Sequence, residues 1–378
     1  MIYSMQSPVG SRTLINGRWR DYFAGCSYLG LQNHPGLLDA AAAALRQYGL
    51  GTATSRGGYG EHPLYREVEA AAAAYWGADA ATYYVTAYLG NAVLAQGLAG
   101  DYERIFVDDA SHYSVWDGAR TVGLPLHPFH HLDAGDLAVQ LRDHLKPGER
   151  PLVFSDGVFP ISGEIAPAPA YRAVLASYGG AILCLDDAHA TGVLGAHGRG
   201  TLEHWAALNS QLPISHSPTL PVRQYAAHTL SKALGSHGGV IAGDAALIAR
   251  LGRGAKALVA TSPSALPAAG AAAWALRFMA GDTELRARLR ANVAAARAGL
   301  RGLGWELPDS PVPILCLASR PGVDLGRLRD ALFARDICVA HVTSYSSVPP
   351  GGALRIAIFA THTGEQIERL VGELAALL

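Results

Sequence analysis

Short apolar runs that alternate with helix-like segments are the feature that most constrains the fold of this chain. Each run is three to five residues long, which is too short for a helix, and a helix-like stretch separates it from the next. This alternation predicts an α/β fold with a mostly parallel central sheet that helices cover on both faces. The runs lie at residues 81–85, 104–107, 152–155, 181–185 and 240–242.

The same pattern divides the 378 residues into an arm and two domains. Residues 1–34 form an irregular N-terminal arm, and the alternation occupies a large domain over residues 35–280. From residue 281 the pattern changes to helix, strand, helix, two strands and a final helix, which predicts a smaller α+β domain over residues 281–378. A chain of this length fits one large domain and one small domain.

Several segments of the large domain carry more specific expectations. Pro35 in a first turn indicates a helix over residues 35–48, and apolar residues on one face indicate another over residues 63–76. Prolines among polar residues indicate an exposed loop over residues 205–224. The Ala-rich residues 244–281 are expected to be helical and to lead to the domain junction.

Charge and hydropathy exclude several classes of partner. The 30 basic and 31 acidic residues give a net charge of −1, so no nucleic acid partner is expected. Charged residues, Gly or Pro interrupt the apolar stretches well before the ~18 residues that a membrane span requires. The first twenty residues contain no evident signal peptide, and the four cysteines stand far apart without a CxxC pair, which fits a reducing cytoplasm.

Most nucleotide and metal motifs are absent from the sequence. There is no GxxxxGK[ST] phosphate loop and no GxSxG nucleophile elbow. The Gly-rich residues 49–60 follow a helix and lack the third small residue of a dinucleotide fingerprint, so they are expected to line a pocket. Asp186, Asp187 and His189 have no second His or Cys cluster that would complete a metal site, and no metal is expected.

A carboxylate and a lysine follow two different strand-like segments. Asp186 ends a buried apolar run, and Lys232 stands among small residues in a polar turn. Because strand ends open onto the ligand crevice of an α/β sheet, the two groups could share that crevice. An accessible amine forms a Schiff base and a carboxylate keeps a pyridine nitrogen protonated, as pyridoxal phosphate enzymes require. The spacing alone leaves open that Lys232 is an ordinary solvated side chain, although the chain has only two other lysines, Lys146 and Lys256.

Six stretches of the sequence carry a more specific signal. They are residues 28–31 (YLGL) with His34 and Pro35, 155–159 (SDGVF), 186–195 (DDAHATGVLG), 229–235 (TLSKALG), 354–356 (LRI) and 361–363 (THT). From about residue 14 to residue 378, the chain resembles the α-oxoamine synthase family of fold-type I pyridoxal-phosphate enzymes. The resemblance implies a fold-type I transferase with pyridoxal 5'-phosphate as cofactor, and a homodimer with active sites at the interface. It also implies decarboxylative condensation of an amino acid with an acyl thioester, carried on CoA or on an acyl carrier protein, to give an α-aminoketone.

The resemblance implies roles for individual residues as well. Lys232 resembles the lysine that binds the cofactor, Asp186 the partner of the pyridine nitrogen, and His189 the donor to the phenolic oxygen. His112 aligns with the imidazole that stacks on the ring, and these four are the expected catalytic residues. The residues expected to bind the phosphate are Thr86, Ala87 and Tyr88 before a helix, Thr229, and Ser264 from a partner subunit.

The expected substrate residues are where the sequence departs from the family. Arg355 resembles the residue that pairs with the amino-acid carboxylate, where a planar guanidinium suits bidentate recognition. Cys26 stands where the family usually has Asn, and Pro160 where it usually has Ser. These two departures favour, as the alternative, an aminotransferase or an aldolase-type enzyme on the same fold. Ala87 replaces a common Gly in the phosphate-binding turn.

Overall fold

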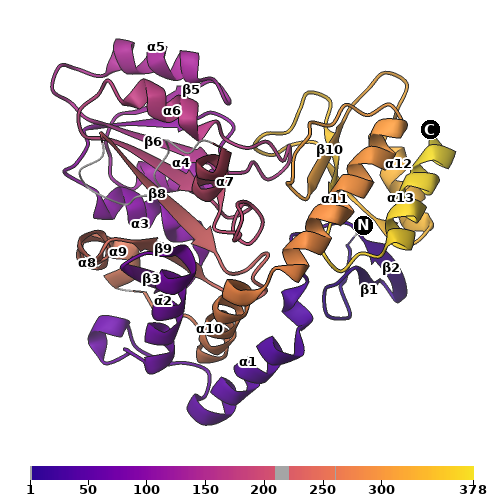
Figure 1. Ribbon diagram of the computed structural model, residues 1–378, viewed down its shortest axis with the longest axis horizontal. Helices are drawn as coiled ribbons and strands as arrows, with labels where there is room; N and C mark the ends of the chain where they lie inside the picture. Colours follow the sequence, from indigo (N-terminus) through magenta and orange to yellow (C-terminus); the bar gives the residue numbers. More distant parts are fainter. Residues whose placement is uncertain (1, 209–220, 260) are drawn as a thin grey trace.

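The computed structural model describes residues 2–208, 221–259 and 261–378. A seven-stranded sheet forms the centre of the larger part of the molecule (Figure 1). The strand order is β3-β9-β8-β7-β6-β4-β5, and neighbours run parallel except where β9 pairs with β3 and β8. The strands are β3 (Ala80–Tyr84), β4 (Arg104–Asp108), β5 (Leu126–Phe129), β6 (Pro151–Asp156), β7 (Ala181–Asp186), β8 (Val222–Thr229) and β9 (Gly239–Gly243). The predicted α/β fold with a mostly parallel sheet is confirmed.

Helices pack against both faces of this sheet. Ile105 and Val107 of β4 lie in one apolar cluster with α3, α4 and α8, whereas Phe106 lies in the opposite cluster with α5 and α6. Because successive side chains of a strand point to opposite faces, a strand that is buried on both faces is apolar throughout. The helices are α3 (Gly90–Gly97), α4 (Tyr113–Arg120), α5 (Ala134–His144), α6 (Ala168–Leu175), α7 (Thr201–Leu208) and α8 (Ala245–Gly254).

Three further helices, α1 (Pro35–Tyr48), α2 (Pro63–Trp76) and α10 (Leu266–Gly281), pack together below the β3 edge in Figure 1. Gly270 allows α10 to approach α1 closely, since a Cβ at this position would lie 2.9 Å from the Cβ of Ala44. The helices predicted over 35–48 and 63–76 are confirmed at both ends. The Ala-rich segment predicted to be helical contains α8, the short α9 (Lys256–Val259) and α10, with non-helical residues between them.

The smaller part of the molecule contains two three-stranded sheets within the described residues. In one sheet β13 (Ala353–Ala357) lies between β10 (Ile314–Ala318) and β12 (Ala340–Val342), and in the other β2 (Arg18–Tyr22) lies between β1 (Arg12–Ile15) and β11 (Ile337–Cys338). Both sheets lie beside α11, α12 and α13 (Figure 1). The bounds of these helices are Glu284–Gly302, Leu325–Ala334 and Gly364–Leu377.

The expectation of an irregular N-terminal arm is wrong, and that of a loop over 205–224 is wrong at both ends. The N-terminal arm contains the hairpin β1–β2, whose turn residues Asn16 and Gly17 both have positive φ angles, as a tight turn between antiparallel strands requires. In the segment predicted to be a loop over 205–224, α7 extends to Leu208 and β8 begins at Val222, while residues 209–220 lie outside the described residues. The sequence did not predict β8 because its alanines and polar residues do not form an apolar run.

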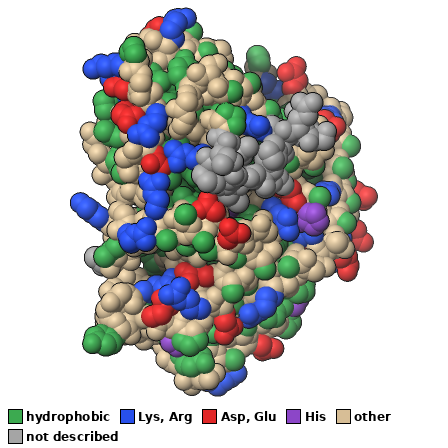
Figure 2. All heavy atoms as spheres, turned by 60° about the vertical axis from the view of Figure 1, so that its left-hand side comes forward, with side chains coloured by type: hydrophobic (Ala, Val, Ile, Leu, Met, Phe, Trp, Pro, Cys, Tyr) green, Lys and Arg blue, Asp and Glu red, His purple; other side chains and the backbone are tan. Residues whose placement is uncertain are grey.

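The surface carries both signs of charge. Figure 2 shows Lys and Arg side chains interspersed with Asp and Glu on one face of the molecule, which agrees with the net charge of −1. In the described part of the chain, none of the helices has the length and the apolarity that crossing a bilayer requires.

Candidate active site

The carboxyl ends of four parallel strands line up polar side chains along one edge of the large sheet. The strands β4, β6, β7 and β8 end at Asp108, Asp156, Asp186 and Thr229. Asp156 and Asp186 are direct neighbours in the pairing of β6 with β7. Lys232 lies in the turn that follows β8. The sequence-predicted carboxylate and lysine therefore follow adjacent strands, as the argument from strand ends expects.

The Asp186 carboxylate is held by donors from three segments. Asn91 of α3 donates its side-chain N–H to Oδ2 at 2.7 Å, and the Ser114 hydroxyl of α4 donates to the same oxygen at 3.3 Å. The backbone N–H of Ala188 donates to Oδ1 at 3.1 Å. Both carboxylate oxygens are thus fixed in a buried position, which defines where a ligand cation or N–H could meet them.

Lys232 ends a chain of four hydrogen-bonded side chains. Its Nζ lies 2.8 Å from Nε2 of His189, whose Nδ1 lies 2.7 Å from the hydroxyl of Tyr28. The Tyr28 hydroxyl in turn accepts a hydrogen bond from Nη2 of Arg355 at 3.1 Å. Burial lowers the pKa of the Lys232 amine, and burial together with the positive charges of Lys232 and Arg355 lowers the pKa of His189 well below its ordinary value.

Arg355 joins three parts of the chain at this site. Its Nε donates to the carbonyl of Pro160 at 2.6 Å and its Nη1 to the carbonyl of Gly25 at 3.0 Å. Its Nη2 also lies 3.7 Å from Sγ of Cys26. Burial acts to raise the pKa of the Cys26 thiol, but the positive charges of Arg355 and Lys232 outweigh burial and lower that pKa. Both sequence-predicted substrate residues therefore lie beside Lys232.

His112 is positioned at the start of α4, over the strand ends. Its backbone N–H donates to Oδ2 of Asp156 at 2.9 Å, and its Nδ1 lies 2.7 Å from the Ser114 hydroxyl. Burial lowers the pKa of His112. Burial and the neighbouring charge of Asp186 raise the pKa of Asp156 well above its ordinary value, so its carboxyl group is favoured in the neutral form.

The predicted phosphate-binding residues lie at two turns beside the strand ends. Thr86 caps the short helical turn of Ala87–Leu89, accepting from the backbone N–H of Tyr88 at 3.4 Å. Tyr88 is half-exposed and donates its hydroxyl to Asp117 at 2.5 Å. Thr229 accepts from the backbone N–H of Ser231 at 3.2 Å. The turn that contains Thr86 leads directly into α3, whose first N–H groups lack helical acceptors.

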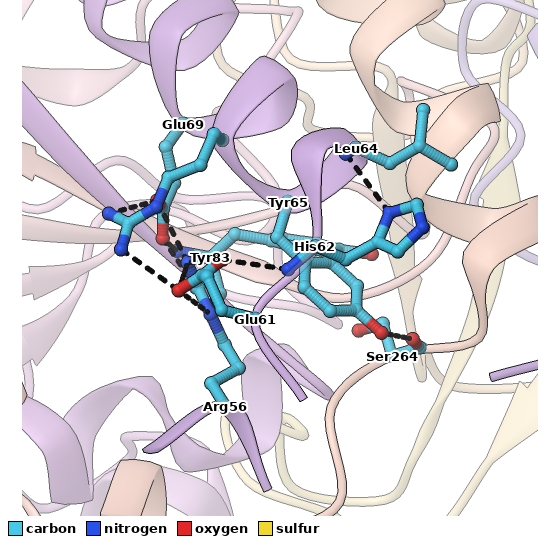
Figure 3. A network of polar contacts seen from close by, with 9 residues as sticks. Arg56, Glu61, His62, Leu64, Tyr65, Glu69, Tyr83 and Ser264 are labelled. Atoms are coloured by element: carbon cyan, nitrogen blue, oxygen red, sulfur yellow. Dashed lines mark hydrogen bonds and ion pairs between the residues drawn. The ribbon is translucent and has the colours of Figure 1, made fainter. Parts of the chain in front are cut away.

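Ser264 lies in a different environment, shown in Figure 3. Its carbonyl accepts the hydroxyl of Tyr65 at 2.7 Å, close to a network in which Arg56 contacts Glu61 and Glu69. The Ser264 hydroxyl is buried and has no hydrogen-bond partner among the described residues. The hydrogen bonds of Ser264 do not reach the Lys232 cluster within one copy of the chain, and its assignment to a partner subunit's site stays a prediction from the family resemblance.

Sequence reasoning assigned no role to four residues that hold this site together, namely Tyr28, Asn91, Ser114 and Asp156. Tyr28 and Asp156 lie inside stretches that carried the family resemblance, and Ser114 stands two residues after His112. Their side-chain contacts join positions far apart in the chain, 161 residues for Tyr28 and His189 and 95 residues for Asn91 and Asp186. Such contacts depend on the tertiary fold, so only the family stretches could have pointed to them. Among the described residues, no group of three or more His, Cys, Asp or Glu side chains is arranged to hold a metal ion.

The comparisons with known proteins agree with one another. The model of the aminotransferase class I and II family matches residues 24–374. An 8-amino-7-oxononanoate synthase from Methylococcus capsulatus is 35% identical over 373 residues, covering 98% of this chain and 92% of that protein. Another, from Thioalkalivibrio sulfidiphilus, is 35% identical over 361 residues, covering 95% and 88%. A solved serine palmitoyltransferase from S. paucimobilis, with a bound PLP–myriocin aldimine, matches with a TM-score of 0.89 at 25% identity, covering 99% of this chain and 92% of that one.

The neutral state of Asp156 gives a prediction for stability. Asp156→Asn should change the free energy of unfolding by less than about 1 kcal/mol, because a neutral amide oxygen can still accept the N–H of His112. Asp156→Ala should cost roughly 1–3 kcal/mol, because this buried N–H loses its acceptor. Urea unfolding of both variants measures the difference, and equal destabilisation by Asn and Ala would show that the ionised carboxylate is what the fold requires.

Proposed function

The chain belongs to the α-oxoamine synthase family within the class I and II aminotransferases, and from this membership we propose that it is a pyridoxal-phosphate-dependent C-acyltransferase. It condenses an amino acid with an acyl thioester, with loss of carbon dioxide, to give an α-aminoketone. The observation that carries the proposal is the placement of a half-buried amine, Lys232, and a buried carboxylate, Asp186, after adjacent strands. An amine and a carboxylate so placed could serve condensation, transamination or aldol cleavage. The relatives named as synthases favour condensation.

The residues present fit pyridoxal phosphate. Asp186 would face the ring nitrogen, Lys232 would bind the aldehyde carbon, and His112 would cover the ring. The hydroxyl of Tyr84 and Oδ1 of Asn91 are buried without hydrogen-bond partners among the described residues, so the region where β3 leads into α3 has polar groups to offer a ligand. When bound, pyridoxal phosphate supplies a protonated pyridine ring that withdraws electrons from the α-carbon of the amino acid.

Lys232 is the proposed base of the reaction. An unprotonated amine can take the proton from the α-carbon, whereas an ammonium group cannot. Burial has the largest effect on the pKa of Lys232 and lowers it, which increases the neutral fraction near pH 7. His189, at 2.8 Å from Nζ, would orient the amine and the cofactor oxygen beside it.

Arg355 is the proposed site for the amino-acid carboxylate. Its Nη2 contacts the sulfur of Cys26 at 3.7 Å, and sulfur is a weak acceptor. A carboxylate that replaced this contact would gain charge-assisted hydrogen bonds from the guanidinium. The carbonyls of Pro160 and Gly25 hold the other edge of the guanidinium, so its orientation is fixed before substrate arrives.

The acyl thioester needs space between the two parts of the molecule. A cavity of about 610 Å³ lies between the two parts, lined by residues 109, 110, 131, 162 and 164 of the large part and by residues 308, 316, 318 and 345–350 of the small part. Tyr345, at its edge, lies with its ring centroid 5.8 Å from that of His112. We propose that the acyl group, carried on CoA or on an acyl carrier protein, enters through this cavity.

We propose a homodimer with shared active sites as the working form. The exposed apolar residues Leu38 and Leu45 lie on one side of α1, and Leu50 and Tyr59 are exposed in the segment that follows. An apolar area of this kind favours burial against another protein surface. The orphaned hydroxyl of Ser264 would reach a phosphate in the second copy. A cytoplasmic location is also proposed, because all four cysteines carry free thiols.

Thiol release tests the proposed reaction. Holoenzyme mixed with an acyl-CoA or an acyl carrier protein thioester should release free thiol and carbon dioxide in equal amounts, and only when glycine, alanine or serine is also present. Alanine is the first amino acid to test, because 8-amino-7-oxononanoate, the product named for the relatives, carries its amino group between a ketone and a terminal methyl, as an α-aminoketone made from alanine would. Lys232→Ala should abolish release, whereas Lys256→Ala in α9 should retain it. Conversion of amino acids without thiol release would instead indicate the aminotransferase or aldolase-type alternative.

The substrate end has its own test. Arg355→Lys keeps the charge but loses the bidentate geometry, so the Kd for the amino acid should rise about tenfold or more while cofactor loading is unchanged. Cys26→Asn should be tolerated and should tighten the binding of glycine, alanine or serine, because an amide offers donors that a thiol lacks. Titration of the cofactor absorbance with each amino acid measures both effects. Unchanged binding by Arg355→Lys would place the carboxylate elsewhere.

A further inference from the structure

Tyr28 occupies the centre of the hydrogen-bonded chain that links Arg355 to Lys232, and neither the family stretches nor the proposed reaction gives its hydroxyl a role. Its side chain is fully buried, and its backbone carbonyl accepts the N–H of Ala360 at 2.7 Å, which fixes the segment in place. Its hydroxyl lies 3.1 Å from Nη2 of Arg355 and 2.7 Å from Nδ1 of His189. The Cys26 thiol is a third neighbour, so the phenol has one partner that can only donate and two that can do either.

The protons of this chain can be assigned from the chemistry of its members. A guanidinium only donates, so the Tyr28 oxygen accepts from Arg355 and its own proton is available for Nδ1 of His189 or for Sγ of Cys26. Sulfur is the weaker acceptor, so the imidazole nitrogen at 2.7 Å is the preferred one. Burial raises the pKa of Tyr28 well above its ordinary value, so the phenol keeps that proton. The lowered pKa of His189 leaves a neutral imidazole with a single N–H.

The position of this single N–H determines which protonation form of Lys232 can form a hydrogen bond with His189. If Nδ1 accepts from Tyr28, the N–H is on Nε2 and points to Nζ of Lys232 at 2.8 Å. An ammonium group has no lone pair, so only the neutral amine can accept this hydrogen bond. In the opposite tautomer Nε2 would carry a lone pair and would hold the ammonium form. Donation from Arg355 polarises the phenol and strengthens its donation to His189.

We propose that Tyr28 is a positioning residue, which donates its hydroxyl proton to Nδ1 of His189 and thereby fixes the tautomer that presents Nε2–H to Lys232. Through this hydrogen bond Tyr28 keeps Lys232 in the unprotonated form. The inference rests on the proposed function only in that Lys232 acts as an amine. It also gives a role to the hydrogen bond from Arg355 to the Tyr28 hydroxyl.

Other groups also act on Lys232 and have to be separated from Tyr28. Negative charge on Cys26 and Asp186 favours the ammonium form, the positive charge of Arg355 opposes it, and Asp156 favours the ammonium form only when it is ionised. The titratable and charged groups that face Lys232 are Cys26, His112, Asp156, Asp186, His189 and Arg355. Substitution of Tyr28 by Phe removes one oxygen and leaves all six in place, so it isolates the contribution of the hydroxyl.

The first measurement uses the wild-type protein. Full-length protein labelled with ¹⁵N-histidine, with His189 assigned by comparison with His189→Gln, reports by NMR which ring nitrogen carries hydrogen. The inference predicts a protonated Nε2 and an unprotonated Nδ1 near pH 7.5. Protonation at Nδ1, or at both nitrogens, would overturn it. This result does not depend on the stability of any Tyr28 variant.

The second measurement follows the pH dependence with which Lys232 binds added pyridoxal phosphate. Only the neutral amine attacks the aldehyde, so the attachment rate, followed by absorbance, rises with pH and levels off above the pKa of Lys232. Tyr28→Phe should move this profile to higher pH by about one unit, equivalent to roughly tenfold slower attachment on its rising limb. Tyr102→Phe is the matched control, because that buried tyrosine donates to the carbonyl of Ala95 at 2.6 Å, within a cluster on one face of the sheet.

The outcomes separate this inference from the proposed function. Identical profiles for wild type and Tyr28→Phe, with attachment at Lys232 intact, would overturn the role of Tyr28 and leave the proposed function standing. An equal shift in Tyr102→Phe would show a general effect of losing a buried hydroxyl and would also overturn it. If pyridoxal phosphate does not attach to Lys232 at all, the proposed function is wrong, and the tautomer of His189 then decides the inference by itself.

Discussion

The placement of a buried carboxylate and a half-buried amine after adjacent parallel strands is the constraint on which the rest of this structure depends. Parallel strands present their carboxyl ends at one edge, so β7 and β8 deliver Asp186 and the turn of Lys232 to the same place. Removing one partner from a buried charged cluster typically costs about 3–5 kcal/mol. The surrounding donors, Asn91, Ser114 and the backbone of Ala188, are what allow Asp186 to remain there.

Arg355 is the second organising element, because it connects the two parts of the molecule at the same point. Its strand β13 belongs to the small part, its Nε contact is to Pro160 near the large sheet, and its Nη contacts are to the segment of Gly25 and Tyr28. A change in the hydrogen bonds of Arg355 on substrate binding would therefore alter those of Tyr28, His189 and Lys232 in turn. The proposed carboxylate-binding residue and the proposed base are thus joined by three consecutive hydrogen bonds.

Sequence reasoning succeeded where local pattern and fold agree, and it failed where contacts are distant. Strands buried on both faces were evident as apolar runs, and α1 and α2 were bounded by Pro and Gly. The strand β8 was missed because alanines and polar residues form much of it, although its side chains are mostly buried. The position of Lys232 and Asp186 after adjacent strands followed from the pattern, and their roles stay predictions from residue type and from the family stretches. Tyr28 could not be assigned, since its partners His189 and Arg355 lie 161 and 327 residues away.

Borohydride reduction of the holoenzyme tests the central claim most directly. Reduction converts the imine between cofactor and lysine into a stable amine, which peptide mass spectrometry locates among the three lysines of the chain. The account predicts a yellow protein whose phosphopyridoxyl group is found on Lys232. Labelling of Lys146, in a polar loop, or of Lys256, in the short helix α9, would contradict it, as would a protein that carries no label.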